Sequence, residues 1–184
     1  MADPAYPWYA VATGDEIQQG DILEACPVFI PPDEIAVPAG DAAREQPPNP
    51  TTFVERTLDL IVMSQSCDLV GGREKVREVL LASLWRRSQV TTGHLASARG
   101  LEDARRGHLP HFHLLAECTL PNFQRELRIV DFRRLYSLPA SFVRRRVAGY
   151  PRIRLLPPYR EQLSQAFARS FMRVGLPIDI PPFS

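Results

Sequence analysis

The densest group of reactive side chains in this sequence is the run Ser64-Gln65-Ser66-Cys67-Asp68, at the end of the apolar segment 58–65. In one interpretation Cys67 is a nucleophile, a histidine from residues 108–113 is its base, and Asp68 orients that histidine or binds a cation. In the other, Ser66 and Asp68 cap a turn through side-chain hydrogen bonds and Cys67 fills a small core space. The sequence favours the second, because one cysteine with no placed histidine is a weak catalytic signal.

Two histidines stand two positions apart further along the chain. On a strand, His111 and His113 would share a face and could chelate Zn²⁺, with Asp131 or a cysteine as further ligand. No CxxC or HExxH spacing accompanies them, so we expect no metal and no cofactor. Alternation along the strand instead predicts Phe112 and Leu114 in the core and both histidines on the solvent face.

The second half of the chain is rich in arginine and carries interspersed tyrosine and phenylalanine. Arginine contacts phosphates and aromatic rings stack on bases, a combination used by single-stranded nucleic-acid sites. The arginines we assign to nucleic-acid or partner binding are Arg133, Arg134, Arg144, Arg145, Arg146, Arg152 and Arg154.

An internal role for the same arginines is the alternative. Residues 1–100 carry 8 basic and 14 acidic groups, whereas residues 101–184 carry 14 basic and 7 acidic groups. This asymmetry suits self-association, an acidic protein partner or RNA, and it suits ion pairing between the two halves equally well. The alternating Arg152-Ile153-Arg154-Leu155 segment predicts an edge strand with its charges directed outward.

The length of the chain and its expected helices and strands predict a single α+β domain over residues 1–184. Such a domain is large enough to bury a core without disulfides. Residues 31–52 hold six prolines, which predicts a long exposed loop. A C-terminal amphipathic helix is expected over 158–174, with Gly175 as its stop. The expected strands are 17–30, opened by a turn at Gly20-Asp21, then 58–65, 78–85, 111–115 and 127–132, with a short helix around Leu101–Arg105.

The overall composition fits a cytoplasmic protein. No apolar run approaches the roughly 20 residues needed to cross a bilayer, and the N-terminus lacks the regions of a signal peptide. The three cysteines are odd in number and widely spaced, which indicates free thiols.

Four segments together resemble the bacterial MazF/PemK-like family of toxin–antitoxin proteins. Gly20-Asp21-Ile22-Leu23 matches its opening strand and Leu60–Ser64 its second. Leu80–Ser83 matches the third, and Val130–Leu135 matches the later segment that leads toward the last helix. The resemblance covers about half of the chain and depends on the order of the motifs.

The resemblance implies a small, SH3-like, strand-rich barrel that binds RNA or a protein partner, with ribonuclease action in some members. Active members use an Arg just before the second strand and a Ser or Thr after the third. Here the family's spacing falls on Leu58 rather than on Arg56, while Ser83 matches. We therefore expect an accessory module that engages RNA or an acidic protein partner through its Arg-rich second half, without strong catalysis.

Two other functions stay open. One is a small ribonuclease or cysteine-dependent hydrolase built from Cys67, Asp68, Ser83, Arg56 and His111. The other is a structural subunit of a homo-oligomer or of a larger complex.

Overall fold

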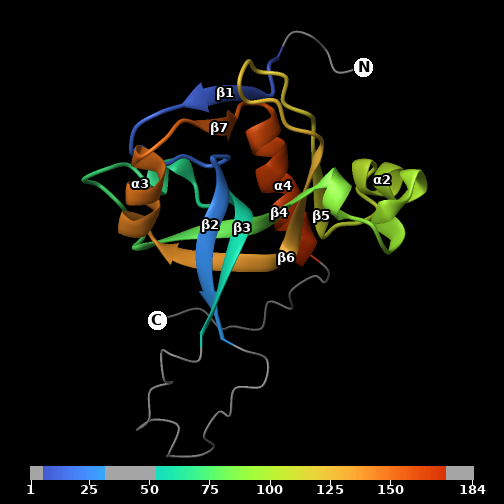
Figure 1. The fold of residues 1–184 in the computed structure, drawn as a ribbon, viewed down its shortest axis with the longest axis horizontal. Coiled ribbons are helices and arrows are strands. Elements are labelled where there is room, and N and C mark those ends of the chain that lie inside the picture. The colour runs from blue at the N-terminus through green and yellow to red at the C-terminus, as the bar shows by residue number, and fades with distance from the viewer. Residues whose placement is uncertain (1–5, 32–52, 173–184) are drawn as a thin grey trace, which may run out of the picture.

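A computed structural model of the chain describes residues 6–31 and 53–172. These residues form a strand-rich α+β fold with two antiparallel sheets and three α-helices (Figure 1). The strands are β1 (Tyr9–Ala12), β2 (Ile22–Ile30), β3 (Val54–Val62), β4 (Glu78–Arg86), β5 (Phe112–Leu115), β6 (Arg128–Pro139) and β7 (Arg152–Leu155). The helices are α2 (Ala98–Arg105), α3 (Ala140–Ala148) and α4 (Tyr159–Phe171), with single 3₁₀ turns at Ser66–Asp68, Arg87–Gln89 and His94–Ala96.

The larger sheet has the strand order β2-β3-β4-β6-β5. Its apolar strand β3 ends in Leu60, Ile61 and Val62, all fully buried. Neighbouring residues of a strand point to opposite faces, so a continuous apolar run requires a core on both sides. Ile61 packs into one hydrophobic cluster, and Leu60 and Val62 pack into another.

Each of these two cores is closed by a helix. Leu163 of α4 packs in the first cluster, and Val143 and Val147 of α3 pack in the second. The amphipathic C-terminal helix is confirmed over Tyr159–Phe171; Pro158 and Met172 flank it, and residues 173–174 of the expected range lie outside the described residues. The short helix α2 is also present and projects beside β5 (Figure 1).

The smaller sheet pairs β1 with β7 and is fastened to the start of β2 around Gly20. Leu155 donates its backbone N–H to the Gly20 carbonyl, at 2.9 Å. Gly20 has φ +85°, and a Cβ there would lie 2.9 Å from the Leu155 Cβ. Only glycine fits such a position, which gives the Gly-Asp pair a structural reason.

Asp21 is fully buried beside this junction and is held by two arginines of β7. Arg152 Nε donates to its carboxylate at 2.9 Å and Arg154 Nη2 at 3.0 Å. The expectation that the charges of β7 point outward is therefore wrong: the Arg152 side chain is 3% exposed and that of Arg154 is 14% exposed. Both turn inward because the Asp21 carboxylate, 131 residues away from Arg152 and 133 from Arg154 along the chain, lies within reach.

The strands do not close into a barrel over the described residues, which instead form the two antiparallel sheets. The Pro-rich loop lies outside those residues except for Pro31. Helix α3 is not among the elements that the sequence predicts. Pro139 directly precedes it, and Ala140, Val143 and Val147 form its buried stripe.

Candidate functional site

The Ser64–Asp68 run forms a tight turn after β3, and its two serines stabilise backbone groups. Ser64 Oγ accepts from the Leu80 N–H at 2.8 Å, and Ser66 Oγ accepts from the Gln19 N–H at 3.1 Å. Both bonds tie the turn to segments far away along the chain. The turn Ser66–Asp68 itself has no side-chain cap, so the expectation that Ser66 and Asp68 cap it through side-chain hydrogen bonds is wrong.

Cys67 and Asp68 face the solvent side of this turn. Cys67 is exposed, and its Sγ lies 3.6 Å from Asp68 Oδ1. Lys75 Nζ lies 3.2 Å from the same carboxylate, and this bond raises the pKa of Lys75. The expectation that Cys67 fills core space is wrong, since it is Leu69 that becomes buried after the turn.

The structure does not gather the five residues predicted for catalysis. Arg56 is exposed near the start of β3, six residues before its end, which is about 20 Å along a strand. Ser83 is buried in β4, paired with Leu60 on one side and Asp131 on the other. His111 precedes β5, which β4 and β6 separate from β3 in the sheet.

Neither histidine of the pair is fully exposed. His113 is largely buried, with its ring stacked near that of Phe132, and burial lowers its pKa to about 4. The prediction that Phe112 and Leu114 form the core face is therefore wrong, since Leu115, on the same face as His113, is fully buried. Among residues 6–31 and 53–172, no three His, Cys, Asp or Glu groups are placed to hold a metal ion.

Five of the seven predicted binding arginines have internal partners, and one of these five, Arg133, pairs with Asp131. Arg152 and Arg154 hold Asp21, as described above. Arg144 bonds to the Leu69 carbonyl and to Glu74, at 2.6 and 3.0 Å. Arg146 donates to the carbonyls of residues 24 and 25. The two halves of the chain thus pair with each other at several points, which is the internal role weighed against nucleic-acid binding.

Arg133 and Arg134 differ, because they border a groove on the outer face of the sheet. The groove has a volume of about 450 Å³. Trp85 pairs with Ile129, and Phe112 pairs with Asp131. Cross-strand partners share a face, and so do residues two apart on a strand, so these four side chains meet there. The loop 89–95 forms the opposite wall.

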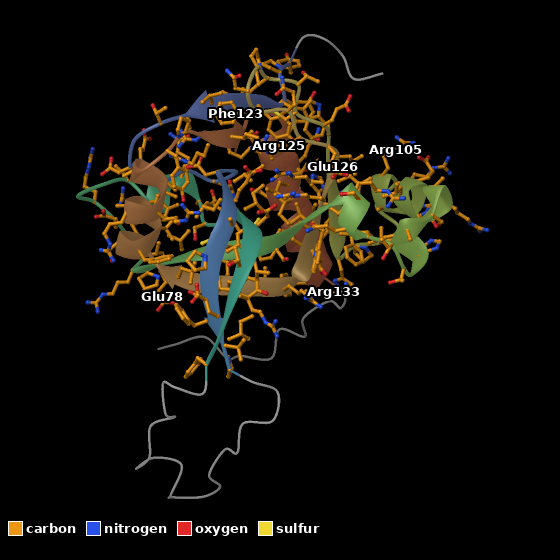
Figure 2. The ribbon with its side chains drawn as sticks, in the orientation of Figure 1. Glu78, Arg105, Phe123, Arg125, Glu126 and Arg133 are labelled. Atoms are coloured by element: carbon orange, nitrogen blue, oxygen red, sulfur yellow. The ribbon has the colours of Figure 1, made fainter. Side chains whose placement is uncertain are left out.

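An irregularity in β6 brings the two arginines to this groove. Ala82 of β4 pairs with Leu135, but the next residue, Ser83, pairs with Asp131, so residues 132–134 have no partner on β4. Such bulges bend a strand and re-aim its side chains. Figure 2 shows Arg133 on the outer side of β6.

Each arginine lies over an aromatic ring. The guanidinium carbon of Arg133 is 4.4 Å from the centre of the Phe112 ring, and that of Arg134 is 5.3 Å from the Trp85 ring. Arg133 also forms a bidentate pair with Asp131, with both N–O distances 2.9 Å, and this pair raises the pKa of Arg133. The separations of 4.4 and 5.3 Å between the guanidinium carbons and the ring centres are cation–π distances.

The groove therefore offers aromatic faces, a fixed cation and a second arginine, Arg134, for which the described residues give no ion-pair partner. Such a set can stack a planar ring and contact a phosphate. Sequence reasoning found Arg133 and Arg134 but missed Trp85 and Phe112. The available signal was the break in alternation at Arg133-Arg134, directly after the regular segment 127–132.

Comparison with known proteins gives no family assignment. No protein-family model matches the chain, and no curated protein sequence matches it significantly. Within the described residues, no helix is both long and apolar enough to span a membrane.

Proposed function

We propose that this protein is a non-catalytic binding module that engages single-stranded RNA through the groove between β4, β5, β6 and the loop 89–95. The observation that supports this most is the placing of Arg133 and Arg134 over Phe112 and Trp85. Stacking on aromatic faces is independent of base identity, so we expect little sequence preference.

The fit of a base has a geometric consequence for Arg134. A base between a guanidinium and a ring needs about 3.5 Å on each side, or about 7 Å in all. Arg134 lies 5.3 Å from the Trp85 ring centre, so it has to move outward by about 2 Å. Its exposure allows this movement.

We extend the proposal to an accessory module of MazF/PemK-like type with an SH3-like sheet, acting in the cytoplasm. Support comes from the order of the elements: β2 begins at Ile22 after the Gly-Asp pair, β3 and β4 follow as antiparallel neighbours, and α4 comes last. The open form of the sheets departs from the closed barrel that the resemblance implies.

A fluorescence anisotropy titration with a labelled single-stranded RNA of about 12 nucleotides tests the function. Trp85→Ala should weaken binding by about 1–3 kcal/mol, the usual contribution of one stacked base. Arg134→Gln should weaken it and lower the slope of log K against log salt by about one. Arg133 is a poorer choice, because its removal leaves the buried Asp131 without its partner.

Arg145→Gln is the matched control. Arg145 is exposed on α3, away from the groove, and the substitution removes the same charge. Equal weakening by R145Q and R134Q would mean that RNA binds through general charge. No binding by the unsubstituted protein at low salt would reject the function.

A further inference from the structure

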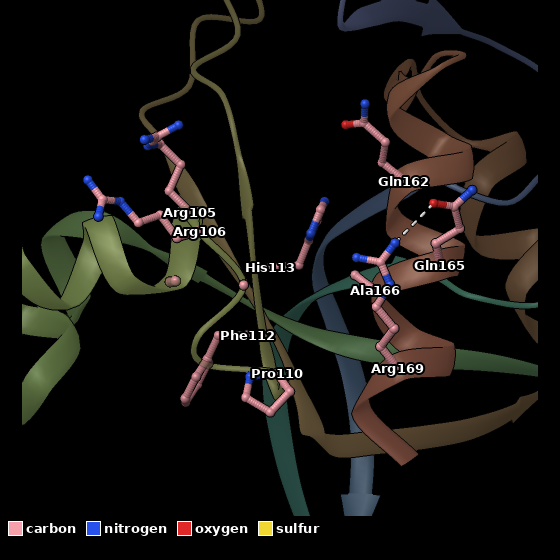
Figure 3. Close-up of a pocket in the computed structure, with 11 residues that line it drawn as sticks. Arg105, Arg106, Pro110, Phe112, His113, Gln162, Gln165, Ala166 and Arg169 are labelled. Atoms are coloured by element: carbon pink, nitrogen blue, oxygen red, sulfur yellow. Dashed lines mark hydrogen bonds between the residues drawn. The ribbon is translucent and has the colours of Figure 1, made fainter. Parts of the chain in front are cut away.

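A second hollow lies on the other side of β5, between the end of α2 and α4, with a volume of about 280 Å³. Arg105, at the end of α2, and Arg106, directly after it, line one side of the hollow, and Gln162, Gln165 and Arg169 of α4 line the other (Figure 3). The remaining lining includes Phe112 and His113 of β5. Each polar side chain on this lining is a hydrogen-bond donor, and no Asp or Glu belongs to it.

His113 gives this pocket a buried polar group that lacks a partner. Figure 3 shows its ring standing between the α2 arginines and the α4 side chains. Its Nε2 is shielded from solvent, and among the described residues it has no hydrogen-bond partner. Buried polar atoms are nearly always paired, so an unpaired one beside a pocket is a place where a ligand can supply the partner.

The arginines around the pocket are held loosely or by an exposed group. Arg169 reaches Gln165 only at 3.5 Å. Arg105 and Arg106 share the single carboxylate of Glu102, at 2.6–2.7 Å, which leaves an excess of positive charge at this end of α2. Their N–H donors exceed what one carboxylate accepts, so a second anion can be shared.

We propose that this pocket binds a phosphate group. Hydrogen-bond donors from two helices and from β5 line the pocket. This arrangement suits a tetrahedral oxyanion better than a planar carboxylate, which a single arginine can bind in a bidentate contact. The pocket is larger than a lone phosphate ion, so it has room for the group that carries it. Phe112 lines both this pocket and the groove of the proposed function.

The shared wall indicates a 5′-phosphate of an RNA strand whose next bases stack in the groove. This assignment of the carrier rests on the proposed function, whereas the phosphate site itself does not. The two sources, free phosphate and strand-borne phosphate, are separated by two arms of one experiment on the full chain.

The first arm titrates inorganic phosphate while the His113 ring is followed by NMR. Burial lowers the pKa of His113, and a bound phosphate dianion beside the ring favours its charged form, so phosphate should raise the titration midpoint of His113. Arg169→Gln should weaken phosphate binding about tenfold. Glu102→Gln should strengthen it, because the competing carboxylate is removed. Arg99→Gln, on the exposed side of α2, removes one charge outside the pocket and should have little effect.

The second arm compares two RNA oligonucleotides that differ only in a 5′-phosphate or a 5′-hydroxyl. Preference for the phosphorylated strand, lost in R169Q, supports the full inference. If the hydroxyl strand binds but phosphate leaves His113 unchanged, the phosphate site is refuted and the proposed function stands. If phosphate binds and neither strand does, the site stands and the RNA function fails.

Discussion

Replacing Asp21 by asparagine tests how the two sheets are joined. The Asp21 carboxylate is fully buried, and it accepts hydrogen bonds from Arg152, Arg154 and the N–H of Gln18, at 2.9–3.0 Å. Asparagine keeps the volume and one acceptor oxygen but removes the charge. Two largely buried guanidinium groups then remain without their counter-ion.

The expected loss is large. Removing one partner of a buried ion pair costs about 3–5 kcal/mol, against a total stability of about 5–15 kcal/mol for a typical protein. With a urea dependence of about 2–3 kcal/mol per molar for a chain of this size, the unfolding midpoint should fall by about 1–2.5 M. Arg152→Met added to D21N should cost less than the two changes do separately, because one uncompensated cation disappears with it.

The assay is equilibrium urea unfolding followed by circular dichroism at pH 7. Glu161→Gln is the matched control, since Glu161 is half exposed and pairs with Arg160 at 2.9 Å, a surface pair that contributes at most about 1 kcal/mol. A midpoint for D21N within the range of E161Q would refute the reasoning that the buried carboxylate holds β7 in place.

Three further predictions concern groups whose environment the fold determines. Burial lowers the pKa of His113 from 6.5 to about 4, so between these pH values the unfolded chain binds a proton at His113 that the folded chain does not. The free energy of unfolding should therefore fall by about 3 kcal/mol as the pH drops from 6.5 to 4. Urea unfolding at a series of pH values measures this dependence, and His113→Asn should flatten it. The bond with Arg125 lowers the pKa of Glu24 to about 2, so the stability that Glu24 contributes is present above pH 4.5 and is lost as the pH falls toward 2. Glu24→Gln should lower the free energy of unfolding by about 1–2 kcal/mol at pH 7, allowing for the partial exposure of Glu24. A loss of stability in this variant that is confined to pH below 4.5 would contradict the sign. Cys67 should react with iodoacetamide in the native protein while Cys26 and Cys118 react only in denaturant, as mass spectrometry of labelled peptides can show; protection of Cys67 would contradict its exposed position.

The sequence itself contained the larger elements. The apolar run of β3 indicated a strand buried on both faces, and the 3/4 spacing of Leu163 and its neighbours indicated α4. Both could be predicted because the faces of an element that are buried determine the pattern of apolar residues along it. The Gly-Asp pair indicated a turn before β2. These are local signals, and local physics is sufficient to interpret them.

The four-residue strand β5 shows where such signals end. Phe112 and Leu114 are as apolar as a core face requires, yet the face of His113 and Leu115 is the one that includes a fully buried residue. A short strand with apolar residues on both faces does not specify its orientation. The packing of α4 against Phe132 and its neighbours decided it.

Only the tertiary structure decided which arginines are available to a ligand. Composition showed an acidic first half and a basic second half, but not that Arg152 and Arg154 would be used on Asp21 while Arg133 and Arg134 would reach a groove. The partner of a charged residue cannot be predicted from spacing along the sequence, because an ion pair forms wherever the fold brings two groups within a few ångströms. The candidate site depends on the bulge in β6 and on side chains from three strands, and those meet only once the sheet has formed.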